Sequence, residues 1–214
     1  MYSLIFISLY LFGFINRDLR FMNYSVSASS KLVSSTHALI TGLCDVLYLC
    51  NIVELIFLRH VIMISIGYCI YDSYNLYQNK HKDIYVLYLH HSFMIIGIMY
   101  CNFNINYEYY RLLALNYLAE ISTIFINFTI FLYETKRTHF KLFHISSIML
   151  LVTFFFTRLV TGIICIYYIY NIGSIMLIPQ LMLTCMNFYW FKSFYQKYMK
   201  ILSHQKSQYQ KKIN

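Results

Sequence analysis

Residues 145–169 read ISSIMLLVTFFFTRLVTGIICIYYI, and this stretch decides the fold class. Arg158 is its only charged residue, and it contains no proline. A helix needs about 20 predominantly apolar residues to cross the core of a bilayer. The stretch therefore predicts a membrane-spanning helix, and similar apolar runs recur along the rest of the chain.

The overall composition agrees with a membrane protein. Of the 214 residues, 59% are hydrophobic and 12% are charged, whereas about a quarter are charged in a typical soluble domain. One soluble globular domain and a disordered chain are both excluded. The apolar runs are continuous rather than alternating, which disfavours a transmembrane β-barrel. The net charge of +9 comes from short gaps and a tail, so nucleic acid is not an expected partner.

Seven apolar runs are candidates for membrane-spanning helices. They cover residues 1–15, 32–50, 56–77, 84–102, 108–133, 140–169 and 174–198. A signal peptide is the alternative for the first run, which is short, but the run lacks a basic start and a small-residue cleavage site. We therefore expect a first helix there. The predicted fold class is an all-α, polytopic membrane helix bundle of about seven transmembrane helices.

Basic residues fill every second gap between these runs. They follow the first, third, fifth and seventh runs: Arg17, Arg20 and Lys31; Lys80 and Lys82; Lys136 and Arg137; and Lys192 with five further lysines towards the end. The positive-inside rule predicts a lumenal N-terminus and a cytosolic C-terminus. The expected domains are an N-terminal helix with a basic cytosolic loop at 1–31, the main bundle at 32–198, and a basic cytosolic tail at 199–214.

The last residues of the tail carry a possible targeting signal. Lys211 and Lys212 form a dilysine at the third and fourth positions from the end. On a cytosolic tail this pattern is typical of an address for retrieval to the endoplasmic reticulum, which a coat protein reads. A lysine-rich tail also matches such a short signal by chance. The expected location is the endoplasmic reticulum or a related endomembrane.

No metal site, cofactor or disulfide is predicted. The six cysteines show no CxxC spacing, and most lie inside apolar runs, as small buried residues do. A metal site needs three or four convergent ligands, and no HExxH or HxxEH spacing occurs.

Ionisable residues inside the runs are costly and call for a reason. From the rise of a helix, His90 and His91 lie about 10 Å from the cytosolic face. Three other residues, Asp72, His37 and Asn127, fall in the same layer. A second layer nearer the lumen holds Asp45 and Arg158, and Glu120 lies between the two layers.

Polar residues also share helix faces. Asn116, Glu120, Thr123 and Asn127 follow helical spacing along one stripe of run 108–133, and three other runs carry similar stripes. The simpler interpretation is a bundle with a polar core, held by hydrogen bonds between helices. The other interpretation is a cavity that opens to the cytosol and holds a lipid or its head group.

The polar layers suggest two kinds of chemistry. Successive residues of a helix point about 100° apart, so one of His90 and His91 is expected to face the cavity. A histidine beside a carboxylate can transfer a proton, and a histidine can also accept an acyl group. The candidate catalytic residues are therefore His90, His91, Asp72 and Glu120.

A second group of residues is expected to bind lipid. It consists of His37, Asn116, Thr123, Asn127 and Arg158. Arg158 either holds a head group or pairs with Asp45.

Short motifs along the chain resemble the TLC-domain family. They are residues 35–38 (STHA), 65–68 (SIGY) with 71–72 (YD), 90–91 (HH), 119–127 (AEISTIFIN), 155–158 (FFTR) and 187–191 (NFYWF). Each motif is weak alone, but together they occur in the family's order over residues 32–198. The resemblance implies a six-helix bundle preceded by one extra helix, an endomembrane location and a role in lipid metabolism, sensing or handling.

Ceramide synthases of this family link a histidine pair and a His-Asp-x-Ser-Asp segment to acyl transfer from acyl-CoA. His90 and His91 match the pair, but Ala119, Glu120 and Thr123 replace the His and the two Asp of the segment. The chain therefore resembles small TLC-domain proteins more closely. The expected function is to bind or tune membrane lipids. Alternatives are an acyl-CoA-dependent N-acyltransferase, with acyl-CoA as co-substrate, and a transporter or cargo escort. The oligomeric state stays open.

Overall fold

Helices make up all the regular structure of the residues that the computed structural model describes, which are 3–22, 25–79, 84–104 and 106–213. The elements are α1 (Ser3–Phe21), α2 (Val26–Leu49), α3 (Leu55–Gln78), α4 (Ile84–Phe103), α5 (Tyr107–Tyr117), α6 (Ala119–Glu134), α7 (Lys141–Phe154), η1 (Phe155–Val160), α8 (Thr161–Asn171) and α9 (Leu177–Ile213). The predicted all-α bundle is confirmed.

The described elements join into seven continuous helices, one for each predicted run. α5 continues into α6 through Leu118, whose backbone stays in the helical region. α7 continues through η1, a π-helical segment, into α8. Neither the interruption at Leu118 nor the π-helical segment was expected from the apolar pattern.

Five of these helices are long and apolar enough to cross a membrane, judged by length and composition over the described residues. They are α2, α3, α4, α5–α6 and α7–η1–α8. α1 and α9 are more polar than these five, since α1 ends with Arg17, Asp18 and Arg20, and the C-terminal half of α9 is rich in lysine. α1 also extends beyond the predicted run 1–15, as far as Phe21. The chain is a multi-pass membrane protein.

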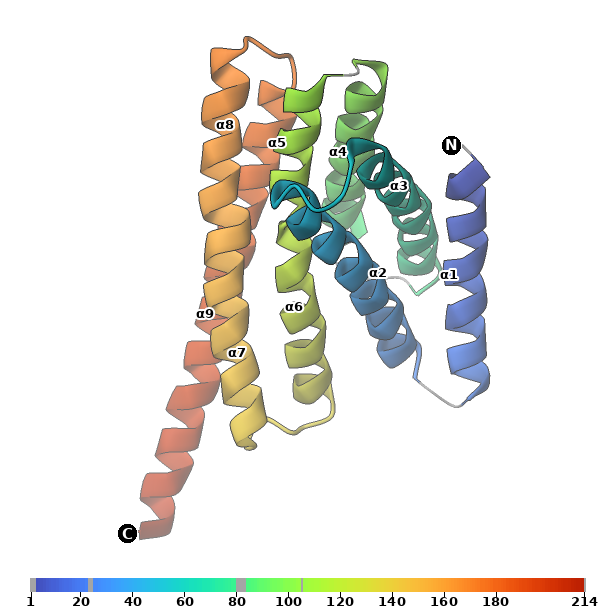
Figure 1. The fold of residues 1–214 in the computed structure, drawn as a ribbon. Coiled ribbons are helices and arrows are strands. Elements are labelled where there is room, and N and C mark those ends of the chain that lie inside the picture. The colour runs from blue at the N-terminus through green and yellow to red at the C-terminus, as the bar shows by residue number, and fades with distance from the viewer. Residues whose placement is uncertain (1–2, 23–24, 80–83, 105, 214) are drawn as a thin grey trace.

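The helices run alternately between two ends of the bundle (Figure 1). The ends of α1, α3 and α6 and the start of α2 lie at the bottom of Figure 1, and we call this side of the bundle the lower end. The upper end holds the connections from α2 to α3, α4 to α5 and α8 to α9. α9 continues past the rest of the bundle at the lower end.

Local sequence explains where several helices begin and end. Ser25 and Asn106 cap the starts of α2 and α5, because each side chain accepts a hydrogen bond from a backbone N–H of the first turn. Asn51, Lys136 and Gly173 follow the ends of α2, α6 and α8 with positive φ angles of 58°, 57° and 63°. This left-handed residue is a common way to end a helix.

α1 and α3 approach each other closely at Gly67. A Cβ atom at Gly67 would lie 2.5 Å from the carbonyl oxygen of Ile5 and still closer to the hydroxyl of Ser8. One turn further along α1, the Phe12 ring packs edge-on against Tyr68, with 5.5 Å between ring centroids. The lack of a side chain at Gly67 therefore allows α1 to cover this face of α3.

Candidate functional site

Two neighbouring cavities lie between the helices. The lower chamber, of about 1660 Å³, is lined by α2, α3, α4, α6, α7, η1 and α9 and extends to the lower end of the bundle. The upper chamber, of about 100 Å³, lies between α4, α5, α6, η1, α8 and α9. Four residues line both chambers and form what we call the junction: His90, Met94, Glu120 and Arg158.

The two chambers differ in chemistry. Most residues around the upper chamber are apolar or aromatic, and its polar side chains gather on the junction, Asn116, Gln180 and Asn187. The lower chamber has many hydroxyl, amide and charged groups, including Lys197, Lys200 and His204 on α9. A molecule that fills both chambers would thus meet polar groups below and mainly apolar groups above.

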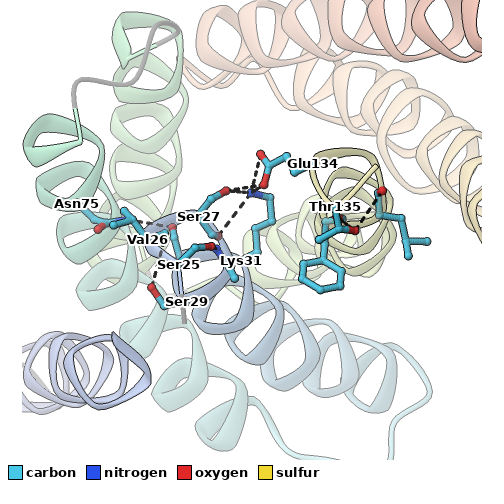
Figure 2. Close-up of polar contacts among 12 residues, drawn as sticks. Ser25, Val26, Ser27, Ser29, Lys31, Asn75, Glu134 and Thr135 are labelled. Carbon is cyan, nitrogen blue, oxygen red and sulfur yellow. Dashed lines mark hydrogen bonds and ion pairs between the residues drawn. The ribbon is translucent and has the colours of Figure 1, made fainter. Parts of the chain in front are cut away.

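An ion pair joins α2 to α6 at the mouth of the lower chamber (Figure 2). The Lys31 ammonium donates to both carboxylate oxygens of Glu134, at 3.1 and 2.9 Å. The Ser27 hydroxyl donates to Glu134 at 2.7 Å and also contacts Lys31. On the other side of α2, Asn75 of α3 donates to Ser30 at 2.9 Å. These contacts fix the start of α2 between α3 and α6.

The structure brings together two of the predicted catalytic residues, Asp72 of α3 and His91 of α4. A carboxylate oxygen of Asp72 lies 3.6 Å from Nε2 of His91. The other ring nitrogen of His91, Nδ1, makes a 2.9 Å hydrogen bond with the Ser73 hydroxyl. Both nitrogens of His91 therefore have protein partners, and its ring is held in place.

His90 is placed differently from its neighbour. It lines both chambers, and its ring stands edge-on to Trp190 of α9, with 5.4 Å between centroids. Its Nδ1 atom is buried and has no hydrogen-bond partner in the described part of the chain. Both histidines line the lower chamber, but only His90 also lines the upper one and has a ring nitrogen left for a bound molecule.

The π-helical segment η1 carries Arg158 to the junction. Its guanidinium donates to the hydroxyls of Ser122 and Thr123 on α6, both at 2.7 Å. A longer contact of 3.5 Å reaches the Asn187 amide oxygen on α9. π-helical turns are frequent at functional sites. Arg158 thus ties three helices together and presents a positive charge to both chambers.

The alternative in which Arg158 pairs with Asp45 is wrong. The guanidinium bonds to α6 and α9, whereas Asp45 lies on α2 with no hydrogen-bond partner for its Oδ2 among the described residues. Asp45 lies one turn above Gly42, which packs against Glu120, whereas the Arg158 guanidinium reaches Ser122 and Thr123 on the lower side of Glu120.

The predicted lipid-binding residues divide into two groups. Asn116 lines the upper chamber, where the Gln180 amide donates to it at 3.0 Å, while Thr123 and Asn127 line the lower chamber. His37 is 1% exposed and lines neither chamber. Its ring instead stacks on the Tyr68 ring, with 3.9 Å between centroids. The structure therefore does not place His37 in contact with a lipid in these chambers.

Several partners at the site were missed from the sequence. Ser73 is an ordinary hydroxyl on a helix, and nothing in its local sequence marks it as a partner of His91. Ser122 lies in the motif at 119–127, but that motif does not show that it accepts from Arg158. The Lys31–Glu134 pair joins residues 103 positions apart, so no local pattern could reveal it. Trp190 lies within a quoted motif, and only the fold places it beside His90.

Metal ligands do not gather in the described residues. They contain no group of three or more His, Cys, Asp or Glu side chains placed to hold a metal ion. The six cysteines are free; Cys50 and Cys185 are exposed, and the others are buried. The chemistry available at the junction is thus that of imidazole, carboxyl and guanidinium groups.

Comparison with known proteins gives a family match. The sequence model of the TLC domain matches residues 14–196, which is most of the 214-residue chain and includes every residue of the junction. No curated protein and no solved structure matches the chain.

Proposed function

We propose a lipid-binding function for this chain, which belongs to the TLC-domain family of membrane proteins. Membership of this family supports a lipid-related role for the multi-pass bundle. Our more specific proposal is that the chain takes a membrane lipid into its two chambers and so contributes to lipid homeostasis. The observation that carries it is that polar and charged groups make up a larger share of the lining in the lower chamber than in the upper one.

The lining of the chambers suggests an orientation for the lipid. The hydrocarbon end belongs in the upper chamber, among side chains such as Leu113, Met176 and Leu183. The carbonyl or hydroxyl groups of the lipid belong at the junction, where Arg158 and His90 supply polar contacts. The head group belongs in the lower chamber, whose polar lining continues to the membrane surface. Apolar pockets with a few placed polar groups are typical ligand sites.

The test is bound-lipid analysis of the purified protein by native mass spectrometry. Gly97 lines the upper chamber, and a Cβ there would meet only Met176 and Leu113, at 3.8 and 3.9 Å. Gly97→Leu should therefore fill the chamber without forcing α4 apart. The matched control is Gly13→Leu on α1, where a Cβ would meet nothing within 4 Å.

We expect the wild type and Gly13→Leu to carry a lipid of defined mass and Gly97→Leu to lose it. Wild-type protein without bound lipid would refute the proposal. Equal lipid in all three proteins would refute the placement of the hydrocarbon end in the upper chamber.

Acyl transfer is the second candidate, and the position of His90 supports it. In that reaction His90 takes a proton from the amine of a long-chain base as the nitrogen attacks the thioester carbonyl of acyl-CoA. A C–N bond forms, the C–S bond breaks, and the CoA thiolate leaves and is protonated. Arg158 would stabilise the negative carbonyl oxygen, while Asp72 and Ser73 would hold His91 as a positioning residue.

An acyl-transfer assay separates the two candidates. Membranes that contain wild type, His90→Ala or the control His60→Ala receive labelled acyl-CoA with long-chain bases and lysolipids. His60 is exposed on α3, outside both chambers. Product from wild type and His60→Ala, but not from His90→Ala, would support the enzyme. No product from folded wild type would leave lipid binding as the function.

For location we propose the endoplasmic reticulum, with the lower end of the bundle in the cytosol. The support is the basic gaps at the lower end and the dilysine of Lys211 and Lys212, whose side chains lie outside the described residues. A coat protein for retrieval would then be a partner. A C-terminal tag should be reachable by antibody after permeabilisation of the plasma membrane alone. A tag reachable only after the lumen is opened would contradict the orientation.

A further inference from the structure

Three buried oxygen atoms without partners lie beside the upper chamber, towards the upper end. They are Oδ2 of Asp45, the hydroxyl of Tyr48 and the hydroxyl of Tyr117, and none has a hydrogen bond within the described residues. The side chains are almost fully buried, at 1%, 3% and 4% exposure. Few buried polar atoms in folded proteins lack partners, and inside a membrane each costs more. Bound water is the usual partner of such atoms.

This group is continuous with the cavity. Tyr117 lines the upper chamber, and Glu120 lines both chambers. α2 and α6 approach closely at Gly42, where a Cβ would lie 3.8 Å from Cβ of Glu120. Asp45 lies one turn above Gly42 on α2 and is within electrostatic range of Glu120. The Asp45 carboxyl group can therefore accept a proton from Glu120, on the side of Glu120 that faces away from the cavity.

The group also reaches the upper end of the bundle. Tyr48 lies one turn above Asp45, and its ring centroid is 6.0 Å from that of Tyr107. Tyr107 begins α5 at the upper end and is 52% exposed. Glu120 lies 13 positions further along the α5–α6 helix, or about 20 Å at 1.5 Å per residue. The group therefore crosses most of a hydrocarbon core of about 30 Å.

We propose that Glu120, Tyr117, Asp45 and Tyr48 form a proton path between the cavity and the upper end of the bundle. Chains of Asp, Glu and His inside membranes are typical of proton relays. At each step one O–H bond breaks as the next forms, with bound water between the side chains, and nothing is oxidised or reduced. A purely structural role fits less well, because Oδ2 of Asp45 makes no hydrogen bond within the described residues that would join helices.

Other titratable groups lie within electrostatic range of the path. From α2, α3, α5 and η1 they are Cys44, Tyr68, Cys69, Asp72, Tyr107, Arg111 and Arg158. Asp45 and Tyr48 line neither chamber, so a change at either residue tests the path without altering the lining of the lipid site.

The experiment measures proton flux in reconstituted vesicles. Purified protein is placed in liposomes that contain a pH-sensitive dye, a pH difference is applied, and valinomycin with equal potassium on both sides compensates the charge. Asp45→Asn and Tyr117→Phe each remove a proton-exchanging group with little change of shape. Tyr110→Phe is the matched control, because its buried hydroxyl bonds to Asn102 at 2.8 Å and lies outside the path.

We expect the wild type and Tyr110→Phe to dissipate the pH difference faster than protein-free vesicles. Tyr117→Phe and Asp45→Asn should lose this excess rate, and if Asp45→Asn does not fold, the decision rests on Tyr117→Phe. A wild-type rate equal to that of empty vesicles would overturn the proposal. Flux unchanged in folded Tyr117→Phe and Asp45→Asn, or leakage of a trapped neutral dye, would do so as well. Bound lipid, measured on the same samples, tests the proposed function separately.

Discussion

A methyl group at Gly67 should push α1 away from α3, and the size of this effect can be worked out from the contact. The new Cβ would lie 2.5 Å from the Ile5 carbonyl oxygen, whereas ordinary van der Waals contact begins at 3.4 Å. α1 must therefore move back by about 0.9 Å, the difference between these two distances. A gap of that order removes about a quarter to a half of the dispersion energy of each contact across it.

The energetic cost is best measured against a second glycine. Overpacking of this kind costs about 1–3 kcal/mol, while replacing a helical glycine by alanine gains about 1 kcal/mol in helix propensity. Gly13→Ala on α1 should show only the stabilisation from helix propensity, because a Cβ there meets nothing within 4 Å. The difference between the two variants is therefore the overpacking cost. At about 2–4 °C per kcal/mol for a chain of this length, it corresponds to about 2–12 °C in Tm.

Unfolding is measured with a thiol-reactive dye, because Cys44, Cys69, Cys101 and Cys165 are buried until the protein unfolds. In one detergent, Gly13→Ala should melt above wild type, and Gly67→Ala should melt clearly below Gly13→Ala. Cys69 packs in the same cluster as Phe12 of α1, so Gly67→Ala should also speed labelling of Cys69 below the melting temperature. Equal Tm values for the two variants would refute the described contact between α1 and α3.

Three further predictions concern the site. Glu134→Gln should lower the free energy of unfolding by no more than about 1 kcal/mol, because its ion pair with Lys31 is partly exposed; a double-mutant cycle with Lys31→Met that gives a larger coupling would contradict this. Arg158→Lys should lower the free energy of unfolding by about 1.5–3 kcal/mol, because lysine cannot reproduce two short hydrogen bonds from one planar group. The thiol-dye melt measures this, and an unchanged Tm would contradict the described hydrogen bonds of Arg158. Trp190 is the only tryptophan and lines the lower chamber, so a brominated lipid should quench its fluorescence saturably. Gly97→Leu should weaken that quenching, and non-saturable quenching would indicate non-specific contact with lipid around the protein instead.

The apolar pattern was sufficient to predict the helices and the common level of Asp72 and His91. Each of the seven runs became a helix, and five of the helices are long and apolar enough to span a bilayer. Depth follows from the rise per residue, and it correctly placed Asp72 at the level of His91. The stripe on α6 faces inwards as the spacing indicated: Asn127 donates to Ser35 on α2, and Thr123 accepts from Arg158.

The apolar pattern does not show how one helix is rotated about its axis relative to its neighbours. Residues at one depth are partners only if their helices turn them towards each other, and helical spacing within a single run carries no such information. This is why Arg158 was assigned to Asp45 as one alternative, and why His37 was grouped with the lipid-binding residues although it packs on Tyr68. The Lys31–Glu134 pair was missed for the same reason.

The π-helical segment has a consequence for the phase of the helix that contains it. A π turn holds one residue more than an α turn, so the residues of α8 are rotated relative to where an unbroken helix from Lys141 would put them. Deleting one residue between Phe155 and Val160 would restore an α-helix and leave α8 facing its present neighbours. α7 would also keep its present facing, and only residues inside the segment, such as Arg158, would change the direction in which they point. A one-residue length difference in this segment would therefore distinguish chains that keep an arginine at the junction from chains that do not.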